Sequence, residues 1–144
     1  MSQAIVEKAA SIVNANTRHQ GADNPICVLS QMDLDGSPTA ATITPSKADG
    51  LRWITLCSGL ESNWAKRCRN DPSACLCFST GEYNISLVGT LRILTDPDVK
   101  REMWYQGLEN HFTGPEDPRY CVFRFETRRY NLLVDWQEVK GTIE

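Results

Sequence analysis

This chain of 144 residues has no long apolar run and no excess of basic residues. No apolar stretch approaches the ~20 residues that a membrane-spanning helix needs. The first residues, MSQAIVEKAASIVNAN, lack the basic and apolar regions of a secretory signal. The 15 Lys and Arg residues are outnumbered by 18 Asp and Glu residues, and a formal net charge of −3 gives no general nucleic-acid footprint. We therefore expect a cytoplasmic protein that binds neither membranes nor nucleic acids.

Paired-cysteine and histidine motifs are missing as well. No two cysteines form a Cys-x-x-Cys pair, and neither His19 nor His111 stands at ligand spacing from a cysteine. We therefore predict no metal site. Most of the cysteines lie in apolar runs, where a free thiol behaves as a small hydrophobic group. We interpret all six as reduced core thiols: Cys27, Cys57, Cys68, Cys75, Cys77 and Cys121.

The length and composition that remain are those of an ordinary soluble protein. With 41% hydrophobic and 23% charged residues, the chain can bury a sizeable core. It is too short for two comfortable domains, and no internal repeat or linker divides it. We expect a single domain over residues 1–144.

The segment from Leu51 to Gly89 carries the clearest chemical signal. An apolar strand, Trp53 to Cys57, ends in Ser58, and Ser62 opens a short basic helix that stops at Asp71. Hydroxyls and free backbone N–H groups at a strand end and a helix start suit a phosphate. Two interpretations remain open at this point. Ser58 and Ser62 contact an anion, or they merely end a strand and cap a helix.

Apolar periodicity and turn residues indicate the other elements. Apolar residues from Ile5 to Val13 repeat at helical spacing, and Asp96 with Pro97 begins a second helix. The turn Asp33 to Gly36 joins two strands into a hairpin. About six strands with short connections predict a mainly β fold, an antiparallel barrel with helices at its edge. The strand segments are Ile26–Met32, Thr39–Pro45, Leu51–Cys57, Ala74–Phe78 and Tyr83–Leu94, and Tyr120–Phe125 together with Tyr130–Val134 completes the sheet.

The order of these punctuating residues resembles the FMN-binding split barrel of the pyridoxamine 5′-phosphate oxidase superfamily, in its general-stress flavin protein branch. The matching features are the DLDGSP turn, the Ser-Gly-x-x-Ser joint at Ser58 to Ser62, Val88-Gly89-Thr90, and the HFTGPEDPRY loop from His111. The resemblance spans roughly Ile26 to Val134. It implies a six-stranded antiparallel split β-barrel with Greek-key character, flanked by short helices, and a homodimer that binds FMN in grooves between the subunits.

The resemblance also assigns cofactor-binding positions. Thr42 falls where many members have an arginine, and Lys47 falls on a lysine. Cys57 and Ser58 fall on an aromatic–Thr pair at a strand end. A Ser-Arg-Lys triplet of the family falls on Ser62, Asn63 and Trp64. A glutamine that contacts the flavin of the partner chain falls on Asn84.

Several of these positions depart from the family pattern. Three of four expected cations are replaced, and without compensation FMN affinity should fall by orders of magnitude, because charge-assisted hydrogen bonds hold a phosphate best. Lys66 and Arg67, one helical turn beyond Ser62, and Lys47 are the candidates to supply charge. FMN is the expected cofactor, and the catalytic residues and the small-molecule substrate remain unassigned.

Three functions follow from the resemblance. The first is an FMN-dependent oxidoreductase, since the flavin itself carries the hydride chemistry. Vitamin B6 oxidation is not expected, because no Arg-x-His substrate clamp follows Val134. The second is a flavin carrier or sensor without catalysis, and the third is a cofactor-free dimeric interaction module. His111, in a Gly/Pro-rich loop, either borders the flavin or is simply exposed.

Overall fold

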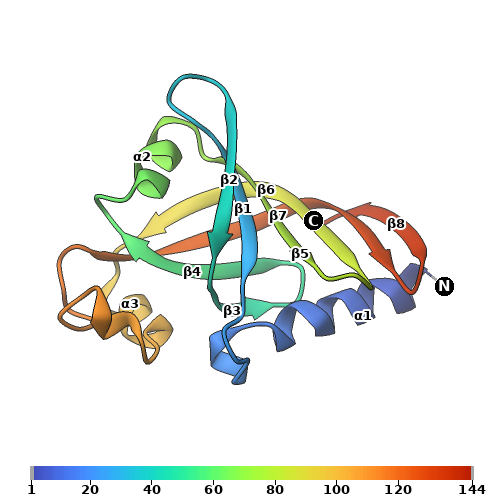
Figure 1. Ribbon diagram of the computed structural model, residues 1–144, viewed down its shortest axis with the longest axis horizontal. Helices are drawn as coiled ribbons and strands as arrows, with labels where there is room; N and C mark the ends of the chain where they lie inside the picture. The colour runs from blue at the N-terminus through green and yellow to red at the C-terminus, as the bar shows by residue number, and fades with distance from the viewer. Residues whose placement is uncertain (1, 144) are drawn as a thin grey trace.

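The computed structural model describes residues 2–143, which form one curled antiparallel sheet with helices along its edges (Figure 1). Helix α1 runs along one end of the sheet, whereas α2, α3 and the loop after α3 gather at the other end. The elements in chain order are α1 (Ser2–Ala15), η1 (Arg18–Gln20), β1 (Cys27–Met32), β2 (Pro38–Ile43), β3 (Pro45–Asp49), β4 (Trp53–Gly59), α2 (Asn63–Asn70), β5 (Ser73–Ser79), β6 (Asn84–Leu94), α3 (Pro97–Met103), η2 (Leu108–Asn110), β7 (Tyr120–Val134) and β8 (Gln137–Thr142).

The strand order confirms the predicted fold class. Neighbouring strands follow the order β2-β1-β5-β6-β7-β4-β3, with β8 paired to β7, and each pairing is antiparallel. This mainly β, curled sheet with short helices is consistent with a split barrel. The hairpin turn is also as predicted, because Gly36 has a φ of 86° and Asp33 N–H donates to the Ser37 carbonyl at 2.7 Å.

The number of strands differs from the six expected. The second expected strand, Thr39–Pro45, ends as β2, which pairs with β1, and an additional strand, β3, begins at Pro45 and pairs with β4. Pro45 at this boundary has no N–H to continue a ladder. The two segments expected within Tyr120–Val134 form one continuous strand, and polar β8 follows it through a hairpin turn. Segment β8 has no apolar run, so its pairing is decided by the turn rather than by periodicity.

The long strand β6 lies unusually close to β7 at Gly89. The register of the two strands shifts between Val88 and Gly89, and a Cβ at position 89 would overlap the backbone carbonyl of Glu126. Only glycine allows this approach. The Val88-Gly89-Thr90 motif therefore has a structural cause in the curvature of the sheet.

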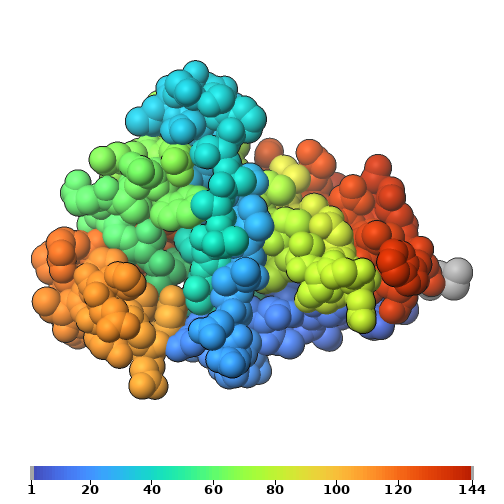
Figure 2. Space-filling model, in the orientation of Figure 1, coloured from blue at the N-terminus to red at the C-terminus, as the bar shows by residue number. Residues whose placement is uncertain are grey.

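The core lies between α1 and the inward faces of the strands. Ile5, Ala9 and Val13 of α1 are buried, as the helical spacing predicted. A second, smaller cluster lies beneath the loop that follows α3 and is formed by Met103, Leu108, Tyr120 and Val122. Figure 2 shows the surface of α2 and the surface of this loop at the same end of the molecule.

The cysteine prediction holds for half of the thiols. All six are unpaired, and Cys27, Cys68 and Cys121 are buried. The other three, Cys57, Cys75 and Cys77, are only partly buried, because they point to the outer face of their strands.

Within residues 2–143 no helix is both long and apolar enough to cross a membrane.

A candidate cofactor groove between α2 and the loop after α3

A groove of about 490 Å³ lies between the end of β4 with the start of α2 and the loop that connects α3 to β7. Its volume is within the usual range of small-molecule sites, about 300–1,000 Å³. One wall is continuous in the sequence and the other comes from residues much later in the chain. The lining residues are Ile43, Thr44, Cys57, Ser58, Gly59, Ser62, Trp64, Tyr105, Leu108, His111 and Phe112.

Two hydroxyl groups mark the β4–α2 wall. Ser62 is the N-cap of α2, and its Oγ accepts a hydrogen bond from the Ala65 N–H at 3.1 Å. Ser58 Oγ–H donates to the same Ser62 Oγ at 3.1 Å. Ser62 thus has both lone pairs engaged, and its own O–H is free to donate toward the groove. The sequence correctly predicted the cap at Ser62 and the helix end at Asp71.

The first turn of α2 adds backbone donors to this wall. The first N–H groups of a helix have no acceptor within the helix. In the part of the chain that the structure describes, the N–H groups of Asn63 and Trp64 have no hydrogen-bond partner. Together with the positive end of the helix dipole, these groups can hold an anion beside Ser62.

Two of the cations proposed from the sequence are already paired. Lys47 Nζ lies 3.0 Å from Glu102 on α3. Arg67 Nε lies 3.2 Å from Asp33 in the hairpin turn, and its guanidinium sits over the Trp64 ring at 5.7 Å. These ion pairs reduce the positive charge available to the groove, so its donors are mainly neutral.

The opposite wall consists of Tyr105, Leu108, His111 and Phe112. Trp104 and Phe112 both pack on the buried ring of Tyr120, with centroid separations of 5.2 and 5.4 Å. The Tyr120 O–H donates to the Lys100 carbonyl at 2.9 Å. Tyr120, the first residue of β7, therefore connects α3 and the loop to the sheet.

Asp117 holds the remainder of the loop. Its carboxylate accepts hydrogen bonds from the N–H groups of Thr113 and Arg119, both at 2.9 Å, and from the Arg119 guanidinium at 2.8 and 3.2 Å. These hydrogen bonds hold the pKa of Asp117 well below its usual range. The buried ammonium of Lys100 donates to the Asp117 carbonyl at 2.9 Å. The loop wall is thus fixed by side-chain contacts rather than by a sheet ladder.

Two partly buried groups with acidic protons, Cys57 and Tyr105, lie where the two walls meet. Burial raises the pKa of Cys57 to about 11, and burial together with Cys57 raises that of Tyr105 to about 12. The Cys57 thiol donates to the Met103 carbonyl at 3.4 Å. Both groups therefore remain neutral at physiological pH, and the groove floor carries no charge from them.

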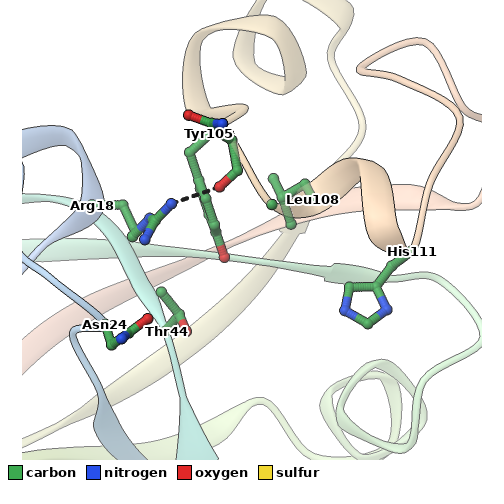
Figure 3. Close-up of a pocket in the computed structure, with 8 residues that line it drawn as sticks. Arg18, Asn24, Thr44, Tyr105, Leu108 and His111 are labelled. Carbon is green, nitrogen blue, oxygen red and sulfur yellow. Dashed lines mark hydrogen bonds between the residues drawn. The ribbon is translucent and has the colours of Figure 1, made fainter.

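A smaller side pocket of about 210 Å³ opens next to the groove (Figure 3). It shares Thr44, Tyr105, Leu108 and His111 with the groove, and adds Arg18 and other residues from the loops on either side. In Figure 3 Arg18, Asn24 and Thr44 lie on one side of the Tyr105 ring and His111 lies on the other.

The structure brings four of the nine predicted cofactor residues together. Cys57, Ser58, Ser62 and Trp64 line the groove, whereas the other five do not. Of these five, Lys47 is paired with Glu102, as described above. The other four are exposed. Thr42 lies on β2, Asn63 and Lys66 lie on α2, and Asn84 begins β6.

The loop wall was largely missed by sequence reasoning. The sequence identifies the HFTGPEDPRY loop as a family-like motif and gives two interpretations of His111, as a residue that borders the flavin or as an exposed one. Nothing in the spacing indicated that Tyr105, Leu108 or Phe112 faces Ser58. Their signal was the aromatic and apolar content of the segment between α3 and β7, which exceeds what an exposed loop needs.

Comparison with known proteins places this fold and groove in a family. The family model for pyridoxamine 5′-phosphate oxidase matches residues 14–133, and no curated protein matches the chain. Among solved structures, a Clostridium acetobutylicum protein related to general stress protein 26 is 24% identical, with a TM-score of 0.77 over 95% of this chain and 96% of that chain. General stress protein 26 of Bacillus anthracis is 19% identical, with a TM-score of 0.78 over 95% and 97%.

A third solved structure is a pyridoxamine 5′-phosphate oxidase-related, FMN-binding protein from Nostoc punctiforme. It is 12% identical, with a TM-score of 0.68 over 94% of this chain and 95% of that chain. At these identities the three structures show a shared fold. The family match, by contrast, covers most of the sequence and both walls of the groove, which confirms the family predicted from the sequence: the chain belongs to the pyridoxamine 5′-phosphate oxidase family.

Proposed function

We propose that the groove binds FMN and that the protein is a flavin-dependent oxidoreductase other than a vitamin B6 oxidase. The observation that carries the proposal is the hydroxyl pair of Ser58 and Ser62 at the start of α2, which opens into a groove with aromatic walls. A phosphate at the α2 end and a flat ring system along the walls would use both features. The FMN-binding relative from Nostoc punctiforme supports the choice of flavin.

The residues of the groove fit FMN through neutral donors. The Ser62 O–H and the N–H groups of Asn63 and Trp64 would receive the phosphate. The rings of Tyr105 and Phe112, with Leu108, would contact the apolar part of the flavin and exclude water from it. Bound FMN would supply two-electron hydride chemistry, so the chain itself needs only to bind and orient the reactants.

The scarcity of free cations predicts weaker binding than the family pattern would give. Lys47 and Arg67 are held by Glu102 and Asp33, and Lys66 is exposed on α2 outside the groove lining. Each charge-assisted hydrogen bond to a phosphate contributes roughly 1.5–3 kcal/mol. We therefore expect FMN binding that is measurable but reversible, and strengthened by an added cation at the helix start.

We further propose that two copies of the chain pair through the outer face of β1, β5 and β6. Small uncharged side chains cover this face in register, as Val28, Cys77 and Ser86 form one row and Ser30, Cys75 and Val88 form the next. All six are half-buried although they lie on the outer side of the sheet. Such a surface without charged side chains suits an obligate interface.

Asn84 links the dimer to the cofactor. Its side chain lies on this same outer face, with Nδ2–H donating to Ser86 Oγ at 3.2 Å. Asn84 lies far from the groove of its own chain, because it pairs with Leu133 of β7 whereas the groove residue Cys57 pairs with Val122 of the same strand. The family resemblance assigns Asn84 to the flavin of the partner. A dimer through this face would explain why Asn84 does not line its own groove.

Titration with FMN, followed by quenching of flavin fluorescence, tests the cofactor assignment. Ser62→Asp keeps a good helix cap but brings a carboxylate to the phosphate position, so it should weaken FMN binding about tenfold or more without loss of stability. Ser62→Ala should weaken FMN binding and also lower the stability of the protein, because the helix cap is lost. Asn63→Arg should tighten binding. Asp96→Ala, which removes the cap of α3 outside the groove, is the matched control and should leave FMN affinity unchanged.

The same preparation separates the three functions. Bleaching of the bound flavin on anaerobic addition of NAD(P)H supports an oxidoreductase, whereas bound flavin that no electron donor reduces indicates a carrier or sensor. Failure of saturating FMN to bind the native chain would contradict the proposal and leave a cofactor-free dimer. Sedimentation tests the dimer independently, and a mass of one chain at micromolar concentration would contradict it.

A further inference from the structure

The side pocket next to the groove has an unusual balance of charge. Its lining contains one arginine, Arg18, and no Asp or Glu. Within residues 2–143 Arg18 forms no ion pair, a property that it shares with Arg52, Arg69, Arg128 and Arg129, but of these five arginines Arg18 alone lines the side pocket. An arginine without an acidic partner in a concave site attracts an anion, because its charge there is not neutralised by the protein.

Two contacts fix the Arg18 guanidinium before any ligand arrives. Its Nη2–H donates to the Gln106 carbonyl at 2.6 Å, which Figure 3 marks with a dashed line. The same guanidinium lies over the Tyr105 ring at 5.0 Å. A stacked, anchored guanidinium loses little entropy on binding and keeps its other in-plane N–H donors for a carboxylate or phosphate. Arg18 is thus preorganised for an anionic group.

The other polar side chains of the pocket complete a recognition site. Asn24, Thr44 and His111 offer hydrogen bonds from the two sides of the Tyr105 ring (Figure 3). Asn24 has a φ of 48°, in the left-handed region that few residues other than glycine and asparagine adopt.

We propose that the side pocket is the substrate subsite of the groove and that the substrate is a small organic anion. Its carboxylate or phosphate would bind Arg18, and its remainder would extend along Tyr105 and Leu108, which line both cavities. This position would bring the substrate to the edge of the proposed flavin site. The anion site stands on Arg18 alone, whereas its role as a substrate subsite rests on the proposed FMN function.

Binding to the 144-residue chain without flavin tests the anion site directly. The probes are benzoate and phenyl phosphate, which carry the two candidate charged groups, and benzyl alcohol, which has the same ring without charge. NMR or calorimetric titration should give benzoate or phenyl phosphate an affinity about tenfold or more above that of benzyl alcohol. The affinity should fall as salt concentration rises. The ratio of the two anions tells which charged group the site prefers.

Two arginine variants separate the pocket from general charge effects. Arg18→Met keeps an apolar stem but removes the fork, and it should weaken anion binding about tenfold to a hundredfold. Arg69→Met is the matched control, because Arg69 also donates to a backbone carbonyl, that of Leu60 at 2.8 Å, but lies outside both cavities. Arg69→Met should leave anion binding unchanged.

The outcomes distinguish this proposal from the proposed function. Equal binding of anion and alcohol, or equal loss in both arginine variants, would overturn the anion site. If Arg18→Met weakens FMN as much as benzoate, and FMN displaces benzoate, then Arg18 holds the flavin phosphate and the substrate subsite is wrong. If benzoate binds through Arg18 while FMN never binds, the proposed cofactor fails but the anion site stands.

Discussion

The β4–α2 wall of the groove is built from consecutive residues, 57–64, whereas the opposite wall comes from the loop between α3 and β7. The first wall is held mainly by backbone hydrogen bonds, because residues 57–59 of β4 pair with β7 and α2 begins at Asn63. The second is held by side chains, chiefly Tyr120 and Asp117. A single substitution can therefore loosen the loop wall while the β4–α2 wall keeps its shape.

The two walls also differ in the part of a ligand that each would contact. The donors that suit a phosphate belong to the β4–α2 wall, at Ser62 and the start of α2. The residues that would meet the rest of the proposed ligand, Tyr105 and His111, belong to the loop wall and to the side pocket. Changes in the loop should alter which ligand is accepted more than whether an anion binds at α2.

The largest expected effect is on stability, from Tyr120→Ala. Removal of this fully buried ring takes away the surface on which Trp104 and Phe112 pack, and we expect the free energy of unfolding to fall by about 3–5 kcal/mol. Tyr120→Phe keeps the ring but loses the hydrogen bond to the Lys100 carbonyl and the weaker one with the Cys57 thiol, so it should cost about 1–2 kcal/mol. Urea unfolding measures both. Equal costs for the two variants would show that the ring does not support the loop wall.

The next effect separates the walls directly, through Asp117→Asn. Asparagine cannot accept all the hydrogen bonds of the carboxylate, and its amide group would face the Arg119 guanidinium. Amide exchange in residues 105–119 should quicken and FMN affinity should fall about tenfold, while exchange in β4 stays unchanged. Asp135→Asn, which breaks the exposed pair with Lys8, is the control. Uniform acceleration across the sheet would contradict the independence of the two walls.

The same contrast explains what the sequence could predict. The strand, the cap at Ser62 and the helix end at Asp71 are local signals, set by neighbouring residues, and all three were predicted correctly. The loop wall depends on contacts between residues far apart in sequence, such as Lys100 with Asp117 or Tyr120 with Cys57. Lys47 was proposed as a phosphate ligand because the sequence gives its charge but not its partner, Glu102, which the fold brings to 3.0 Å.

The smallest expected effect concerns alkaline pH and the point where the walls meet. Burial raises the pKa of Cys57 from 9.0 to about 11, so its contribution to stability is complete below about pH 9 and is lost as the pH rises through 11. At pH 10 this amounts to about 1 kcal/mol of unfolding free energy, which urea unfolding at pH 8 and pH 10 would detect. Cys57→Ala should remove this share of the alkaline loss.

Cys27→Ala is the matched control, because burial raises the pKa of Cys27 as well, to about 12, but Cys27 lies in the core away from the groove. Both variants should reduce the alkaline loss of stability. Because a Cys57 thiolate would bring a negative charge to the groove lining, FMN affinity should also fall at alkaline pH, and only Cys57→Ala should reduce that fall. A Cys27→Ala variant that protected FMN binding equally well would show that alkaline pH weakens the whole sheet rather than the junction of the two walls.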